Sequence, residues 1–167
     1  MNTDYSTNLT DKQWQVIEKV INPQERTRKH SLRDIMNAIL YINKTGCQWR
    51  LLPREFGPWQ TVYYYFRKWK LEHKFPRLAK ILADGGYHGT LGDWVAKKFG
   101  WTVEVVLRPD ECPTKFPVLP KRWIVERSFS WLENFRRLTI DYEYLADTAE
   151  AMVQLAFAQI MLNKFFQ

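Results

Sequence analysis

Two acidic residues in the second half of the chain are the first candidates for chemistry. Asp84 ends a short apolar run, residues 78–83, and two glycines follow it. If the run is a buried strand, Asp84 lies at its carboxyl end, where open parallel sheets place ligand-binding groups, and the glycines let a substrate approach the backbone. This position suits a metal ligand. The alternative is an aspartate that begins a turn, for which Asp-Gly is common.

Glu126 is the second candidate and lies within residues 121–131, KRWIVERSFSW. Arg122 precedes it by four residues, so a helix stacks the two side chains. An ordinary i,i+4 ion pair, worth about 0.2–0.5 kcal/mol, explains this spacing equally well. The flanking rings are those of Trp123, Phe129 and Trp131. We expect them to bury much of the helix, and a carboxylate beside buried rings needs a cationic partner or a metal ion.

Three short helices are predicted in the first half of the chain. The first extends from a capping box at residues 10–13 to a break at Asn22-Pro23. Ser31 caps the second, which ends near Gly46, and the third begins at Pro58. Three helices within about 70 residues predict a compact helical domain.

The second half has the pattern of a small α/β layer. Apolar and β-branched runs predict strands at 78–83 and 102–107, with a helix at 92–99 between them. A strand, a helix and a second strand imply a parallel pair. Helical patterns follow at 123–138 and 148–166. The fold class is therefore α+β, with an N-terminal three-helix domain, two strands and C-terminal helices.

Positive charge is concentrated in the first half and favours a polyanionic partner such as double-stranded DNA. The formal net charge is +7, and residues 1–74 contain 13 Lys and Arg against 7 Asp and Glu, whereas residues 75–167 contain 12 against 11. The candidate DNA-binding residues, which would contact phosphates or the sugar-phosphate backbone, are Arg26, Arg28, Lys29, Arg33, Tyr63, Arg67, Lys68 and Lys70. The alternative is a solvated basic face over an aromatic core.

Other classes of protein fit the sequence poorly. The first eleven residues lack the pattern of a signal peptide, and the longest apolar stretch, residues 151–166, is interrupted by polar residues. We therefore expect no membrane partner and a cytoplasmic location. Cys47 and Cys112 are isolated and there are 3 histidines, which supports neither a disulfide framework nor a zinc site.

Several longer motifs resemble one known family. They are GCQWRLLP at 46–53, PWQTVYYYFRKW at 58–69, ADGGY at 83–87, VLPKRWIVER at 118–127, RRL at 136–138 and DYE at 141–143. Residues 5–74 resemble the N-terminal region of insertion-sequence transposases of the fifth family, and residues 77–162 resemble the end of the same proteins. The resemblance covers nearly the whole chain.

The resemblance implies an RNase H-like catalytic domain in which an Asp-Asp-Glu triad holds two Mg²⁺ ions that cut and join DNA. Asp84 matches the second aspartate of the triad, Glu126 matches its glutamate, and Arg122 matches the arginine of the same helical motif. Asp84 and Glu126 are thus the expected metal ligands. The implied domains are a helical DNA-binding domain, 1–74, and a truncated RNase H-like catalytic domain, 75–167.

The main departure from the family lies between Lys74 and Phe75. Family members carry roughly another domain there, including the strand that bears the first aspartate, so the chain resembles an internally deleted copy. Two-metal chemistry needs a bridging carboxylate, whereas two carboxylates suit at most one weakly held, hydrated Mg²⁺. The conceivable replacement ligands are Asp93, Asp110 and Glu111, none of which lies on a strand beside Asp84.

The sequence leaves three possibilities for function open. One is DNA-mediated transposition with binding at terminal inverted repeats, represented by a copy with defective catalysis. Another is a non-enzymatic DNA-binding protein that occupies element ends or pairs with an intact transposase as an inhibitor. The third possibility is the product of a decaying gene, without a function. The candidate protein partners are a second copy of the chain and an intact transposase. We also expect residues 1–74 to fold independently, and the truncation to expose a sheet edge and the apolar faces of the C-terminal helices.

Overall fold

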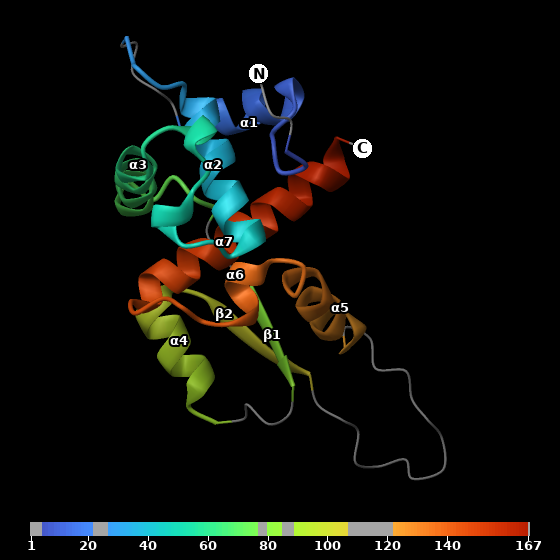
Figure 1. The fold of residues 1–167 in the computed structure, drawn as a ribbon. Coiled ribbons are helices and arrows are strands. Elements are labelled where there is room, and N and C mark those ends of the chain that lie inside the picture. Colours follow the sequence, from blue (N-terminus) through green and yellow to red (C-terminus); the bar gives the residue numbers. More distant parts are fainter. Residues whose placement is uncertain (1–4, 22–26, 77–79, 85–88, 107–121, 167) are drawn as a thin grey trace. The chain divides into compact units, whose positions relative to one another are not determined.

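The computed structural model describes residues 5–21, 27–76, 80–84, 89–106 and 122–166. The chain forms two compact units, which are described separately. Unit 1 combines Met1–Pro76 with Leu132–Gln167, and unit 2 is Arg77–Trp131. Figure 1 shows the order of the elements along the chain.

All regular secondary structure among the described residues of unit 1 is helical. Its helices are α1 (Asp11–Ile21), α2 (Leu32–Thr45), α3 (Trp59–Leu71), α6 (Arg136–Thr139) and α7 (Ala146–Phe165), and two short 3-10 helices, η1 (Trp49–Leu51) and η2 (Arg54–Phe56), lie between α2 and α3. The three helices predicted for the first half are confirmed. The predicted capping box is also present, because the Thr10 amide donates to Gln13 Oε1 at 2.9 Å and the Gln13 amide donates to Thr10 Oγ1 at 3.3 Å.

Helix α2 has well-defined ends. At its start the Ser31 side chain accepts a hydrogen bond from the Arg33 amide, and at its end Gly46 adopts a φ of 69° and donates to the Ile42 carbonyl. A β-carbon at Gly46 would lie 3.0 Å from Arg136 Cβ. Both the left-handed backbone and the close approach of α6 therefore require glycine at this position.

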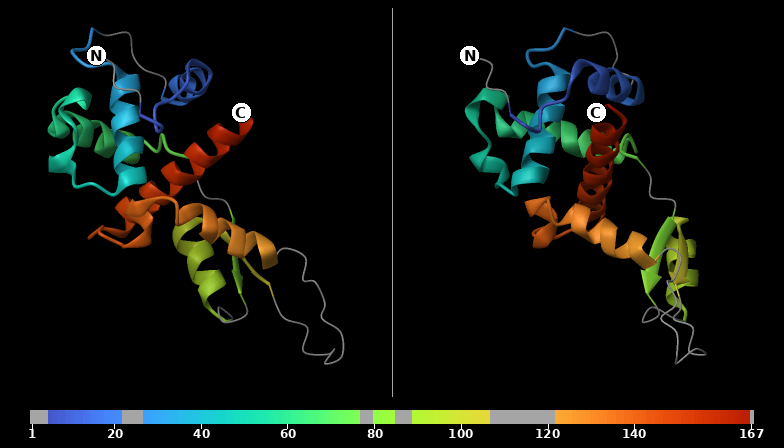
Figure 2. Two further views of the ribbon diagram at one scale, coloured as in Figure 1. Left: turned by 45° about the vertical axis from the view of Figure 1, so that its right-hand side comes forward. Right: turned by 90° about the vertical axis from the view of Figure 1, so that its right-hand side faces the viewer.

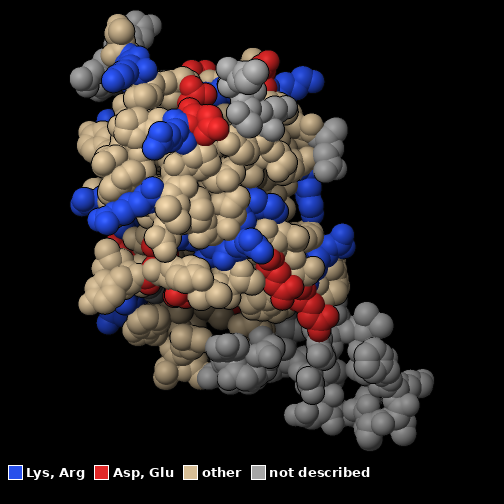
Figure 3. Space-filling view, in the orientation of Figure 1, with Lys and Arg blue, Asp and Glu red and all other residues tan. Residues whose placement is uncertain are grey.

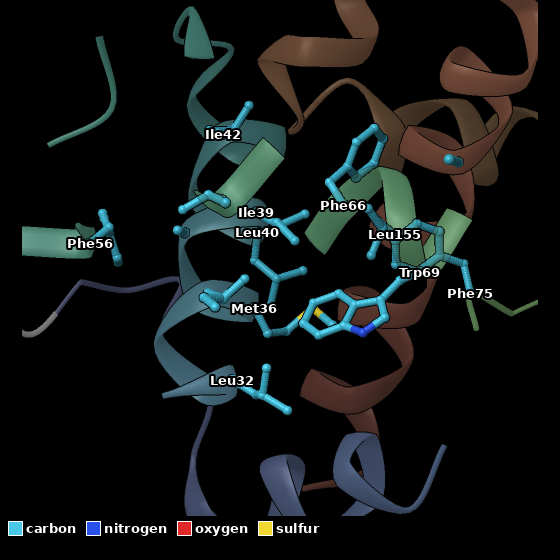
Figure 4. Packing of buried hydrophobic residues seen from close by; sticks show 14 of the residues in the cluster. Leu32, Met36, Ile39, Leu40, Ile42, Phe56, Phe66, Trp69, Phe75 and Leu155 are labelled. Carbon is cyan, nitrogen blue, oxygen red and sulfur yellow. The ribbon is translucent and has the colours of Figure 1, made fainter. Parts of the chain in front are cut away.

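The core of unit 1 surrounds α2. Nine of the fourteen residues of α2 are buried, which leaves it little face for solvent. Figure 4 shows side chains of α2, α3 and α7 in one cluster, with Met36 and Trp69 pointing toward each other. The largest fully buried side chains are Ile35, Ile39, Leu40, Ile42, Asn43, Val62, Phe66 and Met152.

The C-terminal helix α7 supplies part of this core. Ala151, Met152, Leu155 and Ala156 are buried, and the Asn43 side chain donates to the Met152 carbonyl at 3.0 Å. Both ribbon views of Figure 2 place α7 beside α2, and residue contacts join the two helices. The expectation that this helix exposes its apolar face is wrong for its first half. Unit 1 draws on both ends of the chain, and a functional domain boundary at residue 74 stays a prediction.

The predicted helix 123–138 is in fact two helices. Helix α5 (Arg122–Leu132) ends before a turn, and α6 begins after Phe135, which has an extended backbone and is 3% exposed. Lys44 Nζ of α2 lies 4.7 Å from the centre of the Phe135 ring. Phe135, at the start of α6, is thus buried within unit 1.

Unit 2 contains the predicted strand, helix and strand. Strand β1 (Lys80–Asp84) pairs in parallel with β2 (Thr102–Val106), with Lys80 opposite Thr102, and α4 (Leu91–Phe99) connects them. The described residues of the whole chain thus form a helix-rich fold with a two-stranded parallel sheet, which confirms the α+β class. In this described part no helix is long and apolar enough to cross a membrane.

The two faces of the sheet differ. A β-carbon at Gly92 of α4 would lie 4.0 Å from Val103 Cβ, so α4 covers the face that carries Val103 and its register partner Ile81. The opposite face carries Lys80 and Glu104, which form an ion pair. Among the described hydrophobic residues of unit 2 only Val95 is buried, at 7% exposure. In the part of the chain that the structure describes, unit 2 therefore has a much smaller core than unit 1.

Met152→Ala tests whether α7 is part of the core. We expect the free energy of unfolding to fall by about 2–5 kcal/mol, the usual cost of deleting a buried methionine side chain. Met161→Ala on the same helix is the matched control, because Met161 is 45% exposed whereas Met152 is 0% exposed. Urea denaturation followed by circular dichroism measures both. Equal small losses for the two variants would contradict the described packing.

Candidate carboxylate site and nucleic-acid interface

Asp84 occupies the last position of β1, opposite Val106 of β2. The sequence prediction placed it at the carboxyl end of a strand, and its backbone lies there. Glycines 85 and 86 fall outside the described residues. This end of a parallel strand is where ligand-binding groups gather in open sheets.

Glu126 lies on α5, four residues after Arg122, the first residue of that helix. Glu126 is exposed, and so are two of the rings that were expected to bury it, with Trp123 54% and Phe129 63% exposed. The expectation of a glutamate held among buried rings is therefore wrong. The Arg127 guanidinium instead lies 5.6 Å from the Trp123 ring and 5.4 Å from the Trp131 ring.

The carboxylates do not form a three-ligand metal site in the described part of the chain. No group of three or more His, Cys, Asp or Glu side chains among these residues is arranged to hold a metal ion. Of the conceivable replacement ligands, Asp93 is exposed in the first turn of α4, and Asp110 and Glu111 lie outside the described residues. Among the described residues no set of side chains fits a two-Mg²⁺ centre, which needs a carboxylate shared between the ions.

The cations before and at the start of α2 differ in their surroundings. Arg28 is half-buried, Lys29 is exposed, and Arg26 lies outside the described residues. Arg33 Nη1 lies 2.6 Å from Asp11 Oδ1, and its Nη2 donates to the Leu9 carbonyl at 2.5 Å. Arg33 thus joins α1 to α2, and its assignment as a phosphate ligand stays a prediction.

Helix α3 carries the other predicted DNA contacts. Arg67 and Lys68 are exposed, and Lys68 Nζ lies 3.8 Å from Glu72 Oε1, a surface pair of small energetic value. Lys70 is only 16% exposed, because its Nζ donates to Thr148 Oγ1 at 3.1 Å and lies 3.5 Å from Asp147 Oδ2 of α7. Lys70 therefore links α3 to α7, a role that its sequence position does not indicate.

Tyr63 presents a partly exposed ring on the same helix. It is 37% exposed and packs edge-on against Trp49 of η1, with ring centres 5.0 Å apart. Figure 3 shows Lys and Arg side chains at several places on one face, some on the side of α3, with Asp and Glu among them. Arg67, Lys68 and Tyr63 are the predicted contacts on α3 that remain available to a phosphate backbone.

A buried ion pair on the C-terminal segment was missed by the sequence analysis. Arg137 and Glu143 side chains are 8% and 11% exposed, Arg137 Nε donates to Glu143 Oε1 at 2.7 Å, and Arg137 Nη1 donates to the Cys47 carbonyl at 3.4 Å. The pair fixes the segment between α6 and α7 against the end of α2. Both residues fall within the RRL and DYE motifs, so the signal was present, but pairing across a turn is not visible in a linear pattern.

Unit 1 also has an apolar groove of about 550 Å³. It is lined by residues of α1, α2 and α7 and by the segment after α3, including Val20, Met36, Phe75, Leu162 and Phe165. Because almost no polar group converges on it, the groove has no means of acid-base or metal chemistry.

Burial raises the pKa of Glu150 on α7 above its ordinary value of 4.5; the negative charge of Asp147 adds to the rise, and His73 opposes it. In the pH range between the ordinary and the raised pKa, the folded protein holds a proton that the unfolded chain has lost. Folding stability from this group therefore falls as pH rises through that range, and the penalty is fully present above it.

Glu150→Gln should remove this penalty. We expect the variant to be more stable than the parent at pH 7, and the difference to shrink as pH falls through the raised pKa toward 4.5. Thermal unfolding from pH 4 to 7 measures the difference. Glu133→Gln, which changes an exposed glutamate at the end of α5, is the control. A difference that grows on acidification would contradict the sign.

Comparison with known protein families gives two matches on adjacent parts of the chain. Residues 9–79 match the model of a family described as "Putative transposase of IS4/5 family". Residues 81–163 match the model of a family described as "Transposase DDE domain". No curated protein and no solved structure matches the chain.

Proposed function

Because this chain belongs to the insertion-sequence transposases, we propose that it binds double-stranded DNA at terminal inverted repeats and cannot carry out strand transfer alone. The observation that supports this proposal is the contrast between its two functional parts. Positive charge is concentrated in residues 1–74, whereas the segment that matches the DDE-domain model carries candidates for two of the three carboxylates that the resemblance implies. The proposed location of the protein is the cytoplasm.

DNA binding is supported by charge and exposure. The excess of Lys and Arg lies in residues 1–74, within the part that matches the first transposase family. Arg67 and Lys68 are adjacent and exposed on α3, and Tyr63 lies one turn before Arg67 with a partly exposed ring. Cations neutralise phosphates, and a tyrosine hydroxyl can donate to a phosphate oxygen. Arg28 and Lys29 extend this proposed interface.

Loss of catalysis is supported by the ligand set. Asp84 and Glu126 are the proposed metal ligands, and Arg122 is the proposed phosphate-binding residue of the same site. The proposed deletion at Lys74-Phe75 removes the first aspartate, and the described residues offer no third ligand in its place. Two Mg²⁺ ions would supply the attacking hydroxide and stabilise the leaving oxygen, which needs ions about 3.5–4 Å apart. Two carboxylates without a bridging third do not hold the ions in that way.

The second candidate function is that of a non-enzymatic regulator. A chain that binds the same repeats as an intact transposase, or pairs with one, would block assembly of an active complex. The well-packed unit 1 supports this candidate, because DNA binding by its exposed cations would not require catalysis. Inhibition of an intact transposase by the added chain distinguishes it from an inert remnant.

Arg67→Ala with Lys68→Ala should weaken binding of the full chain to duplex DNA. We expect the slope of log K against log salt to fall by about 0.9 for each lost phosphate contact. Fluorescence anisotropy at several salt concentrations measures this slope. Lys12→Ala with Lys19→Ala removes two exposed charges from α1 and is the charge-matched control. Equal effects of the two double variants would place DNA contact elsewhere.

Purified protein should not cleave terminal-repeat DNA with Mg²⁺ or Mn²⁺, since a bridging carboxylate is missing. Asp84→Asn and Glu126→Gln should leave this null result unchanged. A gel assay of labelled duplex, with an intact transposase as the positive control, tests the expectation. Cleavage that disappears in Asp84→Asn would contradict the proposal and indicate a replacement ligand.

A further inference from the structure

The outer edges of the two-stranded sheet are the surface of unit 2 that offers a binding site for another strand. In the described residues β1 pairs with β2 alone, so each strand has a second edge without a described neighbour. A sheet of two strands is marginally stable by itself, and an unpaired edge is a template for another strand. The scarcity of buried hydrophobic residues in unit 2 adds to this requirement.

The sequence of β1 is complementary to itself in one antiparallel register. When two copies of Lys80–Asp84 run in opposite directions about a two-fold axis at Leu82, Lys80 of each copy stands opposite Asp84 of the other. Ile81 stands opposite Ala83, and Leu82 opposite Leu82. Opposite charges on facing positions stabilise an antiparallel pair, and this register overlaps all five residues.

Symmetric antiparallel pairing of two β2 strands would bring like charges together. A symmetric antiparallel pair of Thr102–Val106 places Glu104 directly opposite Glu104 of the second copy. Like charges at facing positions are destabilising. Charge therefore selects β1 over β2 as the symmetric edge. Pairing of β1 with β2 of another copy is head-to-tail and produces open chains rather than a closed dimer.

The existing ion pair of unit 2 is compatible with the β1 pairing. Lys80 of β1 contacts Glu104 of β2 on the sheet face opposite α4. In the paired sheet Lys80 would lie between Glu104 of its own copy and Asp84 of the other.

We propose that a second copy of this chain pairs with the edge of β1 that has no neighbour among the described residues. The product is a two-fold symmetric, mixed four-stranded sheet with the order β2-β1-β1-β2, in which the two central β1 strands are antiparallel and each β1 remains parallel to its own β2. Each copy completes the edge of the other. The pairing is independent of DNA binding and of catalysis, and it engages the strand that ends at the proposed metal ligand Asp84.

Leu82→Cys tests the register directly, in full-length chain with Cys47→Ser and Cys112→Ser. Facing residues of antiparallel strands have Cα atoms about 4.5–5.5 Å apart, within the range that a disulfide bridges. We expect mild oxidation to give a covalent dimer of Leu82→Cys and little dimer of Lys97→Cys, an exposed control on α4. Equal cross-linking of the two variants, none of Leu82→Cys, or a ladder of larger species would overturn the proposal.

Reversing the charge at Lys80 or at Asp84 tests whether the strand that pairs with β1 is β1 of a second copy. In the Leu82→Cys background, Lys80→Asp places Asp opposite Asp in a dimer of like chains, and Asp84→Lys places Lys opposite Lys. Each variant alone should cross-link about tenfold less than the parent, because both symmetric pairs become repulsive. Mixing the two variants, one with a size tag, restores both opposite-charge pairs.

The expected result is a cross-linked heterodimer at the parental level and few homodimers of either variant. The mixture also controls for folding, because a misfolded chain would not recover cross-linking on mixing. Homodimers as abundant as the heterodimer would overturn the proposal and indicate association through another surface, such as the apolar groove of unit 1.

Discussion

The burial of α2 on nearly all sides is the constraint on which the fold of unit 1 depends. Because most side chains of α2 are buried, other elements must pack around it. Helix α3 and the 3-10 turn η2 pack against one part of its surface. Further parts of α2 are covered by α6 and α7, which come from the far end of the chain. The buried Arg137–Glu143 pair and the Asn43 contact to the Met152 carbonyl keep these helices in place. Removing one partner of such a buried ion pair would strand the other charge.

Short sequence motifs predicted helix ends and strand order well, but they did not predict contacts between residues distant in the sequence. Ser31, Gly46 and the capping box at residues 10–13 act within one turn, so their effects could be read from the sequence. The parallel strands followed from the strand-helix-strand order. The break before Phe135 was not predicted, and the contact of this ring with Lys44 of a helix distant in sequence has no signal in the local pattern. The same is true of α7, whose partner in the core is not encoded in its own periodicity.

The candidate site shows the same division. The position of Asp84 at the end of a strand was predicted from the run before it, whereas the exposure of the rings around Glu126 was not. Sequence alone treats every cation as available to DNA. The structure uses Arg33 and Lys70 to join helices, so two of the eight predicted DNA-binding residues have an internal role that charge counting cannot distinguish. The exposed cations of α3 carry the DNA-binding proposal.

The discontinuity of unit 1 has a consequence for the order of events during synthesis. The first 76 residues leave the ribosome well before α7, which supplies Met152 and Leu155 to the core they share. At about 5–20 residues per second, this delay is on the order of several seconds. Throughout that time the side of α2 that packs against α7 is uncovered. The nascent chain therefore exposes apolar surface to chaperones and to other nascent chains on the same mRNA.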